Sequence, residues 1–228
     1  MKAIILLSGG VDSTVVLAMA LGRGLVCYGI SFDYGQRHKV ELKSAALIAK
    51  NYGIEQKIII IDPQTFTKSS LTTASTVVPK DRSVAEITSL GIPSTYVPAR
   101  NTLFLSYALG QAEILNADEI HVGFNAMDYN CYPDCRPEYL EAFQRIASLG
   151  TVQGIKGNGI KVIAPLIHMD KTEIFKHGKR LHAPLHLTFS CYDPSIDELP
   201  CQRCDACVLR TSADSFCHSS KNEMMDGG

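Results

Sequence analysis

The sequence lacks the features that would place the chain in a membrane or on a polyanion. No apolar run reaches the roughly 20 residues that span a bilayer. The apolar stretch at residues 4–7 is too short for a signal peptide and is soon interrupted by Gly9 and Gly10. The formal net charge is only −1, so no intact nucleic acid is expected as the main partner. These absences predict a cytoplasmic protein that acts on small molecules.

Two well-known phosphate-binding motifs, G-x-x-x-x-G-K-[ST] and G-x-G-x-x-G, are also missing. In their place, the loop Ser8-Gly9-Gly10-Val11-Asp12-Ser13 lies between an apolar run and a helical pattern. A helix N-terminus offers free N–H groups and partial positive charge, and glycines allow oxygen atoms to approach the backbone. The loop is therefore predicted to bind phosphate, with Asp12 holding Mg²⁺ or capping the helix. The alternative is an ordinary glycine turn.

Buried strands alternate with helices along the chain. Strands are expected at residues 3–7, 25–32, 57–61, 119–123 and 161–164, and helices at 14–22, 38–52, 101–115, 137–149 and 171–178. This order predicts a doubly wound, mostly parallel α/β sheet. Residues 62–98 lack periodicity and are expected to form a partly ordered excursion near the site. Because ligands bind at the carboxyl ends of such strands, the loops at 8–13, 33–38, 96–101 and 123–136 should form that site.

The cysteines are unevenly distributed. Four of the eight, Cys191, Cys201, Cys204 and Cys207, are close together near the C-terminus. Their two overlapping C-x-x-C steps supply four thiolates, which closes a tetrahedral shell and predicts a structural Zn²⁺ site. An iron–sulfur cluster is the chemical alternative. We therefore expect an ATP-binding domain at residues 1–186 and a metal-binding segment at 187–228. The part after Arg210 is expected to be a loose tail, disordered at 224–228.

The glycine loop resembles, residue for residue, the SGGxDS loop of the N-type ATP pyrophosphatases, or PP-loop family. Members of that family adenylate a carboxylate, an amide or a similar oxygen and release pyrophosphate. The string at residues 169–174 (MDKTEI) resembles the late lysine motif of the same family. That resemblance implies that Lys171 reaches the phosphates. The alternative is a solvated lysine at a helix start.

Three further strings resemble the 7-cyano-7-deazaguanine synthase family of queuosine biosynthesis. They are SFDYGQRH at 31–38, TYVPARN at 95–101 and YPDCRPE at 132–138, and the resemblance extends over about residues 3–210. It implies ATP-dependent conversion of 7-carboxy-7-deazaguanine and ammonia to the 7-nitrile. The sequence departs from the family at Cys131, usually glycine, and at Phe189, usually tryptophan. Another PP-loop activity, such as tRNA thiolation, is the alternative.

The same resemblance implies roles for individual residues. Catalysis is assigned to Asp12, Ser13 and Lys171. ATP binding is assigned to Leu7, Ser8, Gly9, Gly10, Val11, Asp12, Ser13, Thr14 and Arg100. Substrate binding is assigned to Arg37, His38, Asn101, Tyr132, Asp134 and Arg136. Asp134 is expected to accept hydrogen bonds from the ring, Arg136 to pair with the 7-carboxylate, and Tyr129 or Tyr132 to stack. The alternative for each of these residues is a role in loop scaffolding or in a surface ion pair. A homodimer, one structural Zn²⁺ per chain, and ATP with Mg²⁺ as co-substrate complete the expectation.

Overall fold

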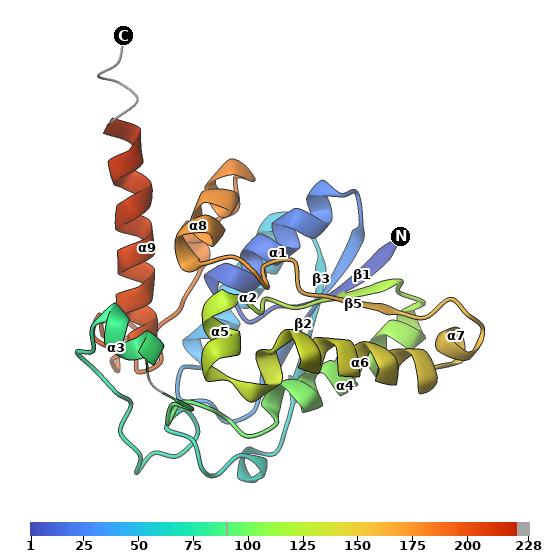
Figure 1. The fold of residues 1–228 in the computed structure, drawn as a ribbon, viewed down its shortest axis with the longest axis horizontal. Helices are drawn as coiled ribbons and strands as arrows, with labels where there is room; N and C mark the ends of the chain where they lie inside the picture. The colour runs from blue at the N-terminus through green and yellow to red at the C-terminus, as the bar shows by residue number, and fades with distance from the viewer. Residues whose placement is uncertain (90, 223–228) are drawn as a thin grey trace.

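Figure 1 shows the computed structural model of the chain. It describes residues 1–89 and 91–222, without the side chains of residues 129, 130 and 216–222. The expected disorder at residues 224–228 and the expected stacking by Tyr129 both lie outside what is described. Within the described residues, no helix combines the length and the apolarity needed to cross a membrane.

Five parallel strands form one sheet. They are β1 (Lys2–Leu6), β2 (Val26–Asp33), β3 (Glu55–Ile60), β4 (Glu119–His121) and β5 (Lys161–Ile163). Their spatial order is β3-β2-β1-β4-β5, with Ile4 of β1 opposite Tyr28 on one side and Ile120 on the other. β1 is therefore central, which explains why its apolar run is buried on both faces. The prediction of a parallel, doubly wound sheet is confirmed.

Helices cover both faces of the sheet (Figure 1). The longer ones are α1 (Val11–Gly22), α2 (Val40–Tyr52), α4 (Arg100–Leu115), α6 (Pro137–Leu149), α8 (Lys171–Arg180) and α9 (Asp205–Asn222). Short helices are α3 (Val84–Ser89), α5 (Ala126–Cys131), α7 (Val152–Ile155), and the 3₁₀ turns η1 (Pro63–Thr65), η2 (Pro133–Cys135) and η3 (Leu185–Leu187). Successive residues of β1 face opposite sides. Ile4 packs in the core formed with α4 and α6, and Ile5 in the core formed with α1, α2 and α8.

Two expectations about these elements are wrong. The third strand is not buried: Ile58 is 48% and Ile60 79% exposed, because β3 is an edge strand paired only with β2. The part after Arg210 is not a loose tail, because residues 205–222 form the continuous helix α9. Ala213 of this helix is buried in the core shared with α8, and Lys179 donates a hydrogen bond to Asp214 across the same contact.

The excursion at residues 62–98 is ordered against the rest of the chain. Phe66, Leu71 and Val97 pack in the core on the α4 side of the sheet. Val78 packs among the clustered cysteines near the C-terminus, in the part of the chain from residue 187 onward that we call the cysteine segment. Lys80 pairs with Cys204 in an antiparallel bridge. The excursion is thus held at both ends by the sheet and in its middle by the cysteine segment.

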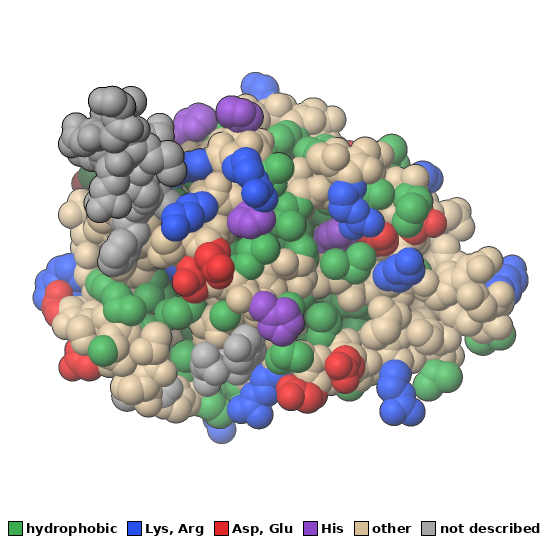
Figure 2. All heavy atoms as spheres, turned by 45° about the horizontal axis from the view of Figure 1, so that its top comes forward, with side chains coloured by type: hydrophobic (Ala, Val, Ile, Leu, Met, Phe, Trp, Pro, Cys, Tyr) green, Lys and Arg blue, Asp and Glu red, His purple; other side chains and the backbone are tan. Residues whose placement is uncertain are grey.

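The surface carries charges of both signs. On the face shown in Figure 2, lysine and arginine side chains are interspersed with acidic ones. That pattern agrees with the net charge of −1 and offers no broad positive field on this face.

An ion pair between a buried carboxylate and a half-exposed arginine links the end of α1 to β4. Glu119, which is 1% exposed, accepts hydrogen bonds from both terminal nitrogens of Arg23 at 2.9 Å. Its Oε2 also lies 2.7 Å from Nε2 of His121. Burial opposes ionisation of Glu119, but the hydrogen bonds from Arg23 and His121 outweigh it and hold its pKa below the usual range.

Replacing Arg23 with methionine is expected to lower the free energy of unfolding by about 2 kcal/mol at neutral pH, because it leaves the Glu119 carboxylate buried with only His121. A carboxyl whose folded-state pKa is depressed stabilises the fold above its unfolded pKa and loses that contribution as pH falls. The deficit should therefore shrink below about pH 4. Urea unfolding at neutral pH and below pH 4 measures this difference in the free energy of unfolding. Lys43→Met, which removes the exposed pair with Glu198, is the control and should change stability by less than about 0.5 kcal/mol.

Candidate active site

A cavity of about 300 Å³ opens at the carboxyl ends of β1, β2 and β4. Strand order reverses between β1 and β4, which is where ligands bind in sheets of this kind. The cavity is also lined by Leu71, Arg82 and Thr95 of the excursion and by Phe189 and Tyr192 of the cysteine segment. Three parts of the chain that are far apart in sequence therefore meet around one space.

The glycine loop forms one side of this cavity. Ser8, Gly10, Asp12 and Ser13 line it, and Gly10 is the N-cap residue of α1. No side chain caps this helix, so its first N–H groups are directed toward the loop without a side-chain acceptor. The Ser8 backbone N–H donates to Oγ of Ser13 at 3.2 Å, which fixes the loop. This arrangement fits phosphate oxygens.

The two glycines of the loop have different roles. Gly9 has a φ of +88°, and a Cβ there would lie 2.2 Å from the carbonyl oxygen of Glu41 on α2. A Cβ on Gly10 would meet nothing closer than Oγ of Ser8 at 3.4 Å. Gly9 is thus required for close packing of the loop on α2, and only Gly10 lines the cavity. Thr14 is likewise outside the lining and donates to the Gly10 carbonyl at 2.8 Å.

Gly9→Ala is expected to destabilise the fold by about 3 kcal/mol, since it adds a backbone clash to the cost of a positive φ. Gly24→Ala is the matched control: Gly24 has a φ of +76° but no atom within 4 Å of its Cβ position. It should cost only about 1 kcal/mol. Chemical unfolding of both variants separates the two contributions. Equal losses would show that the contact with α2 is unimportant.

A charged cluster lies at the base of the cavity. Nζ of Lys171 donates to Oδ2 of Asp12 at 2.6 Å. Asn125 Nδ2 donates to Oδ2 of Asp128 at 2.6 Å and lies 3.4 Å from Oδ2 of Asp12. Burial opposes the charge on Lys171, but Asp12 and Asp128 together raise its pKa. The lysine is therefore a partly buried cation directed at the cavity rather than a solvated residue.

The first turn of α8 explains the position of Lys171. Asp170 is the N-cap residue and accepts a hydrogen bond from the Glu173 backbone N–H at 2.8 Å, while Glu173 accepts one from the Asp170 N–H at 2.8 Å. This capping box fixes the start of the helix. Asp12, in contrast, does not cap α1; it is engaged by Lys171.

Arg100 enters the cavity from the first residue of α4. It donates to the hydroxyl oxygen of Tyr34 at 2.9 Å, and its guanidinium lies 5.6 Å and 5.9 Å from the ring centroids of Tyr34 and Phe104. Burial raises the pKa of Tyr34 to about 12, so its phenol stays neutral. Arg100 is thus a cation held by two aromatic rings.

The expected substrate residues divide into two groups. His38, Asn101 and Tyr132 line the cavity. The others are directed elsewhere: Arg37, Asp134 and Arg136.

Each of these three has a structural reason for its direction. Arg37 donates to the carbonyl oxygens of Ser70 and Thr76 in the excursion. Asp134 accepts the backbone N–H of Asn101 at 3.0 Å, and so it serves the start of α4. Arg136 is exposed at the start of α6. The structure therefore brings neither Asp134 nor Arg136 to the cavity.

The lining residues that the sequence interpretation did not assign include Asp128, Tyr192, Asp205 and Arg210. For Asp128 a signal was present: Asn125 stands three residues before it and caps α5 by accepting the N–H groups of Met127 and Asp128. The other three come from the cysteine segment, whose contact with the cavity has no sequence signature.

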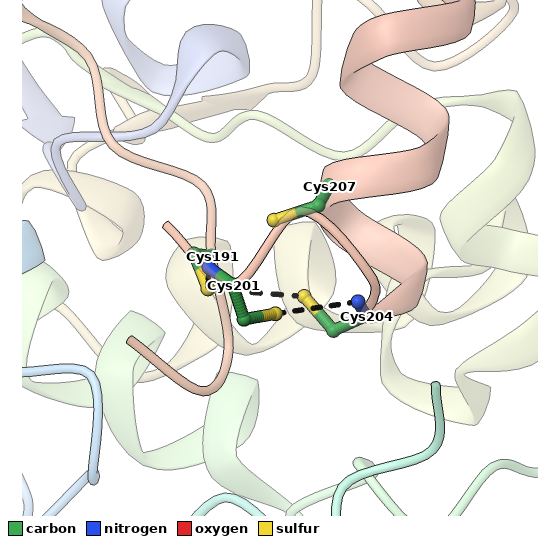
Figure 3. A group of neighbouring side chains, drawn as sticks. All are labelled: Cys191, Cys201, Cys204 and Cys207. Atoms are coloured by element: carbon green, nitrogen blue, oxygen red, sulfur yellow. Dashed lines mark hydrogen bonds between the residues drawn. The ribbon is translucent and has the colours of Figure 1, made fainter. Parts of the chain in front are cut away.

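The four expected metal ligands are close together. The sulfur atoms of Cys191, Cys201, Cys204 and Cys207 all lie within 4.8 Å of one another, and Figure 3 shows the four side chains converging. Backbone N–H groups donate to three of these sulfurs: from Asp193 and Cys201 to Cys191, from Cys204 to Cys201, and from Tyr192 to Cys204. Such donors stabilise thiolates that bind metal. The donor set fits a closed tetrahedral site.

The cysteine segment forms one wall of the cavity. The Phe189 N–H donates to the Gly9 carbonyl at 2.9 Å, which joins the segment to the glycine loop. Arg82 of the excursion forms a two-point ion pair with Asp205, the first residue of α9, and both line the cavity. The cysteine segment and the glycine loop are therefore connected directly and line the same cavity.

A parallel doubly wound sheet, an SGGxDS loop at its switch point and an inward-facing lysine define a nucleotide-binding protein of the PP-loop class. Residues 2–217 match the model of the family described as queuosine biosynthesis protein QueC. The chain belongs to this family of enzymes.

Close relatives agree with this assignment. The 7-cyano-7-deazaguanine synthase of Pseudomonas fluorescens is 50% identical over 210 residues, covering 92% of this chain and 91% of that protein. That of Trichodesmium erythraeum is 51% identical over 214 residues, covering 93% and 95%. Among solved structures, the U34-tRNA thiolase NcsA from Methanococcus maripaludis is 16% identical with a TM-score of 0.48, covering 98% of this chain and 67% of that one. At that likeness nothing about activity is inferred from it.

Proposed function

We propose that this protein is a 7-cyano-7-deazaguanine synthase, which uses ATP to convert 7-carboxy-7-deazaguanine and ammonia into the 7-nitrile. The observation that carries the proposal is that the glycine loop and Lys171 face the same cavity. The relatives that are about half identical bear this name. The cavity of about 300 Å³ is at the lower end of the range for small-molecule sites.

The chemistry explains why a phosphate loop is needed. A carboxylate is a poor electrophile, and its oxygen is a poor leaving group until a phosphoryl group is attached. Ammonia then displaces the activated oxygen and gives the amide. A second activation, now of the amide oxygen, allows that oxygen to leave and the nitrile to form.

Residues of the cavity suit each part of this reaction. We assign ATP, as its Mg²⁺ complex, to Ser8, Gly10 and Ser13, with the open N–H groups of α1 on its phosphates. Lys171 and Arg100 neutralise the charge that develops on the phosphoryl oxygens. Asp12 positions Lys171, to which it is paired.

The planar deazaguanine requires flat surfaces and polar edges. Phe104, Tyr132 and Tyr192 supply aromatic surfaces, and Thr95 and Asn101 supply polar groups around the same space. Asn101 and Tyr132 keep the substrate-binding role expected for them, and His38 stands beside Tyr192, with ring centroids 5.9 Å apart.

We also propose Zn²⁺ as the structural metal in the four-cysteine site, because a closed four-thiolate shell suits it and no redox step is needed. Residues 1–186 act as the ATP-binding part and 187–228 as the metal-binding part. On the family resemblance we propose a cytoplasmic homodimer. No nucleic-acid partner is required, in keeping with a net charge of −1.

The test is direct. Purified metal-loaded protein is incubated with ATP, Mg²⁺, ammonia and 7-carboxy-7-deazaguanine, and products are followed by mass spectrometry. The amide should appear first and the nitrile after it. Folded, metal-loaded protein that forms neither product contradicts the proposal. Thiolation of tRNA in the presence of a sulfur donor would favour the thiolase alternative instead.

A further inference from the structure

Asp128 stands in the cavity without a role in binding phosphate. Its carboxylate lines the cavity and is held through one oxygen by Nδ2 of Asn125 at 2.6 Å. Asn125 is fully buried, and its Oδ1 accepts the N–H groups of Met127 at 3.0 Å and Asp128 at 3.2 Å. The amide of Asn125 is thus fixed by α5, and it fixes the carboxylate in turn.

The surroundings of Asp128 set its proton affinity. Burial raises its pKa to about 6; Lys171 and Arg100 act against the rise, and Asp12 adds to it. The other titratable groups that interact electrostatically with it are Cys131, Tyr132, Cys135 and Tyr192. A carboxyl in this range gains and loses a proton readily near neutral pH.

Two other polar side chains that line the cavity, Asp12 and His38, are held by charged partners. Oδ2 of Asp12 accepts a hydrogen bond from Nζ of Lys171 at 2.6 Å, so this oxygen is engaged by the lysine. Nε2 of His38 lies 3.3 Å from Oε2 of Glu41, so this ring is directed at α2. One carboxylate oxygen of Asp128 accepts a hydrogen bond from the neutral amide of Asn125. Among the described residues, no charged group donates a hydrogen bond to the other oxygen.

We propose that Asp128 is the catalytic base that removes protons from the nitrogen atom in both halves of the reaction. This inference rests on the proposed function. It depends on the position of a fixed carboxylate in the cavity beside the lysine that serves the activation step.

Each half of the reaction moves a proton from nitrogen to Asp128. In the first half, ammonium gives one proton to Asp128, and the freed nitrogen lone pair forms the C–N bond; the nitrogen then gives a second proton to the departing phosphate oxygen, which leaves the neutral amide. The C–O bond to the activating phosphate breaks, and its electron pair leaves on that oxygen. In the second half, activation of the amide oxygen releases one N–H proton to water and gives R–C(=NH)–O–phosphoryl. Its N–H proton passes to Asp128 while the C–O bond breaks and the C≡N bond forms. Asp128 releases each proton to water between steps.

The experiment compares two nitrogen nucleophiles in the Asp128→Asn variant. Ammonia is mostly protonated at neutral pH and needs a base, whereas hydroxylamine is mostly neutral and reacts with the activated carboxylate to give a hydroxamate. Amide formation from ammonia should fall by about 100-fold or more. Hydroxamate formation should stay within about threefold of the unchanged protein. Raising the pH should partly restore amide formation in the variant, because free ammonia increases.

Controls make each outcome decisive. Glu141→Gln, an exposed carboxylate change on α6, should leave both products unchanged. Thermal unfolding and metal content confirm that the Asn variant is folded. If hydroxamate and amide fall equally, Asp128 supports activation and is not the base. If amide formation is unchanged, the assignment is also overturned. Failure of the unchanged protein to form either product contradicts the proposed function instead.

Discussion

Lys171→Met should reduce turnover by about 10³-fold while leaving the fold and the metal content intact. Nζ of Lys171 donates to Oδ2 of Asp12 at 2.6 Å, and the lysine also interacts electrostatically with Asp128. Methionine keeps an unbranched side chain but removes the charge that balances phosphoryl oxygens. It also leaves the charges of Asp12 and Asp128 without this cation, which opposes binding of further negative charge. Steady-state kinetics with the carboxylate and with the amide as substrate measure the loss.

The same variant carries a pH prediction. Lys171 lowers the pKa of Asp128, so its removal makes Asp128 hold its proton more tightly. The acid limb of the pH–rate profile should then move to higher pH. Lys176→Met is the matched control, because Lys176 is exposed on the same helix. It should retain activity within about twofold. Full activity in Lys171→Met contradicts the role in activation.

Cys204→Ser should abolish metal binding and lower the free energy of unfolding by about 4 kcal/mol or more. Cys204 is fully buried against Val78, and its backbone pairs with Lys80. Loss of the metal frees the segment that supplies Phe189, Tyr192 and Asp205 to the cavity. Nucleotide affinity should therefore fall together with stability. Metal analysis, unfolding curves and calorimetric titration with ATP measure the three effects.

A buried cysteine elsewhere provides the comparison. Cys27→Ser changes a thiol in the core beneath α1 and α2, far from the four ligands in the fold. Its thiol donates to the Leu25 carbonyl at 3.6 Å, and a hydroxyl can do the same. This variant should keep its metal and its ATP affinity. If Cys204→Ser also kept its affinity for ATP, the metal segment would not form part of the nucleotide site.

Periodicity predicted the central elements well, since their burial is encoded in the residues themselves. The bounds expected for α6, 137–149, are those observed. The run KIIII at 57–61 predicted a strand but not its exposure, because position within a sheet depends on strand order. The helical part after Arg210 was missed because its sequence is mostly polar. It packs against α8 through one face, which includes Ala213 of α9.

The positions of site residues could be predicted where a motif fixes the backbone. They could be predicted less well where the direction of a side chain depends on its contacts in the fold. The loop at 8–13 and Lys171 face the cavity as their motifs imply. The string at 132–138 predicted that Asp134 and Arg136 face the substrate, and this is not what the structure shows. Asp134, in the turn η2, accepts the Asn101 N–H at the start of α4, and Arg136 is exposed. Arg82 and Asp205 are 123 residues apart in sequence, and only the fold reveals that they meet at the cavity.

The hydrogen bond from Phe189 to Gly9 also has a consequence for biosynthesis of the protein. Gly9 emerges from the ribosome early, whereas its partner and the metal ligands at 191–207 are made after every strand of the sheet. A nascent chain can assemble its sheet before those last ligands are made, but it cannot complete the cavity wall that they support. With the function proposed above, we therefore expect a new chain to stay inactive during translation and to begin consuming ATP only when the four-cysteine site has acquired its metal.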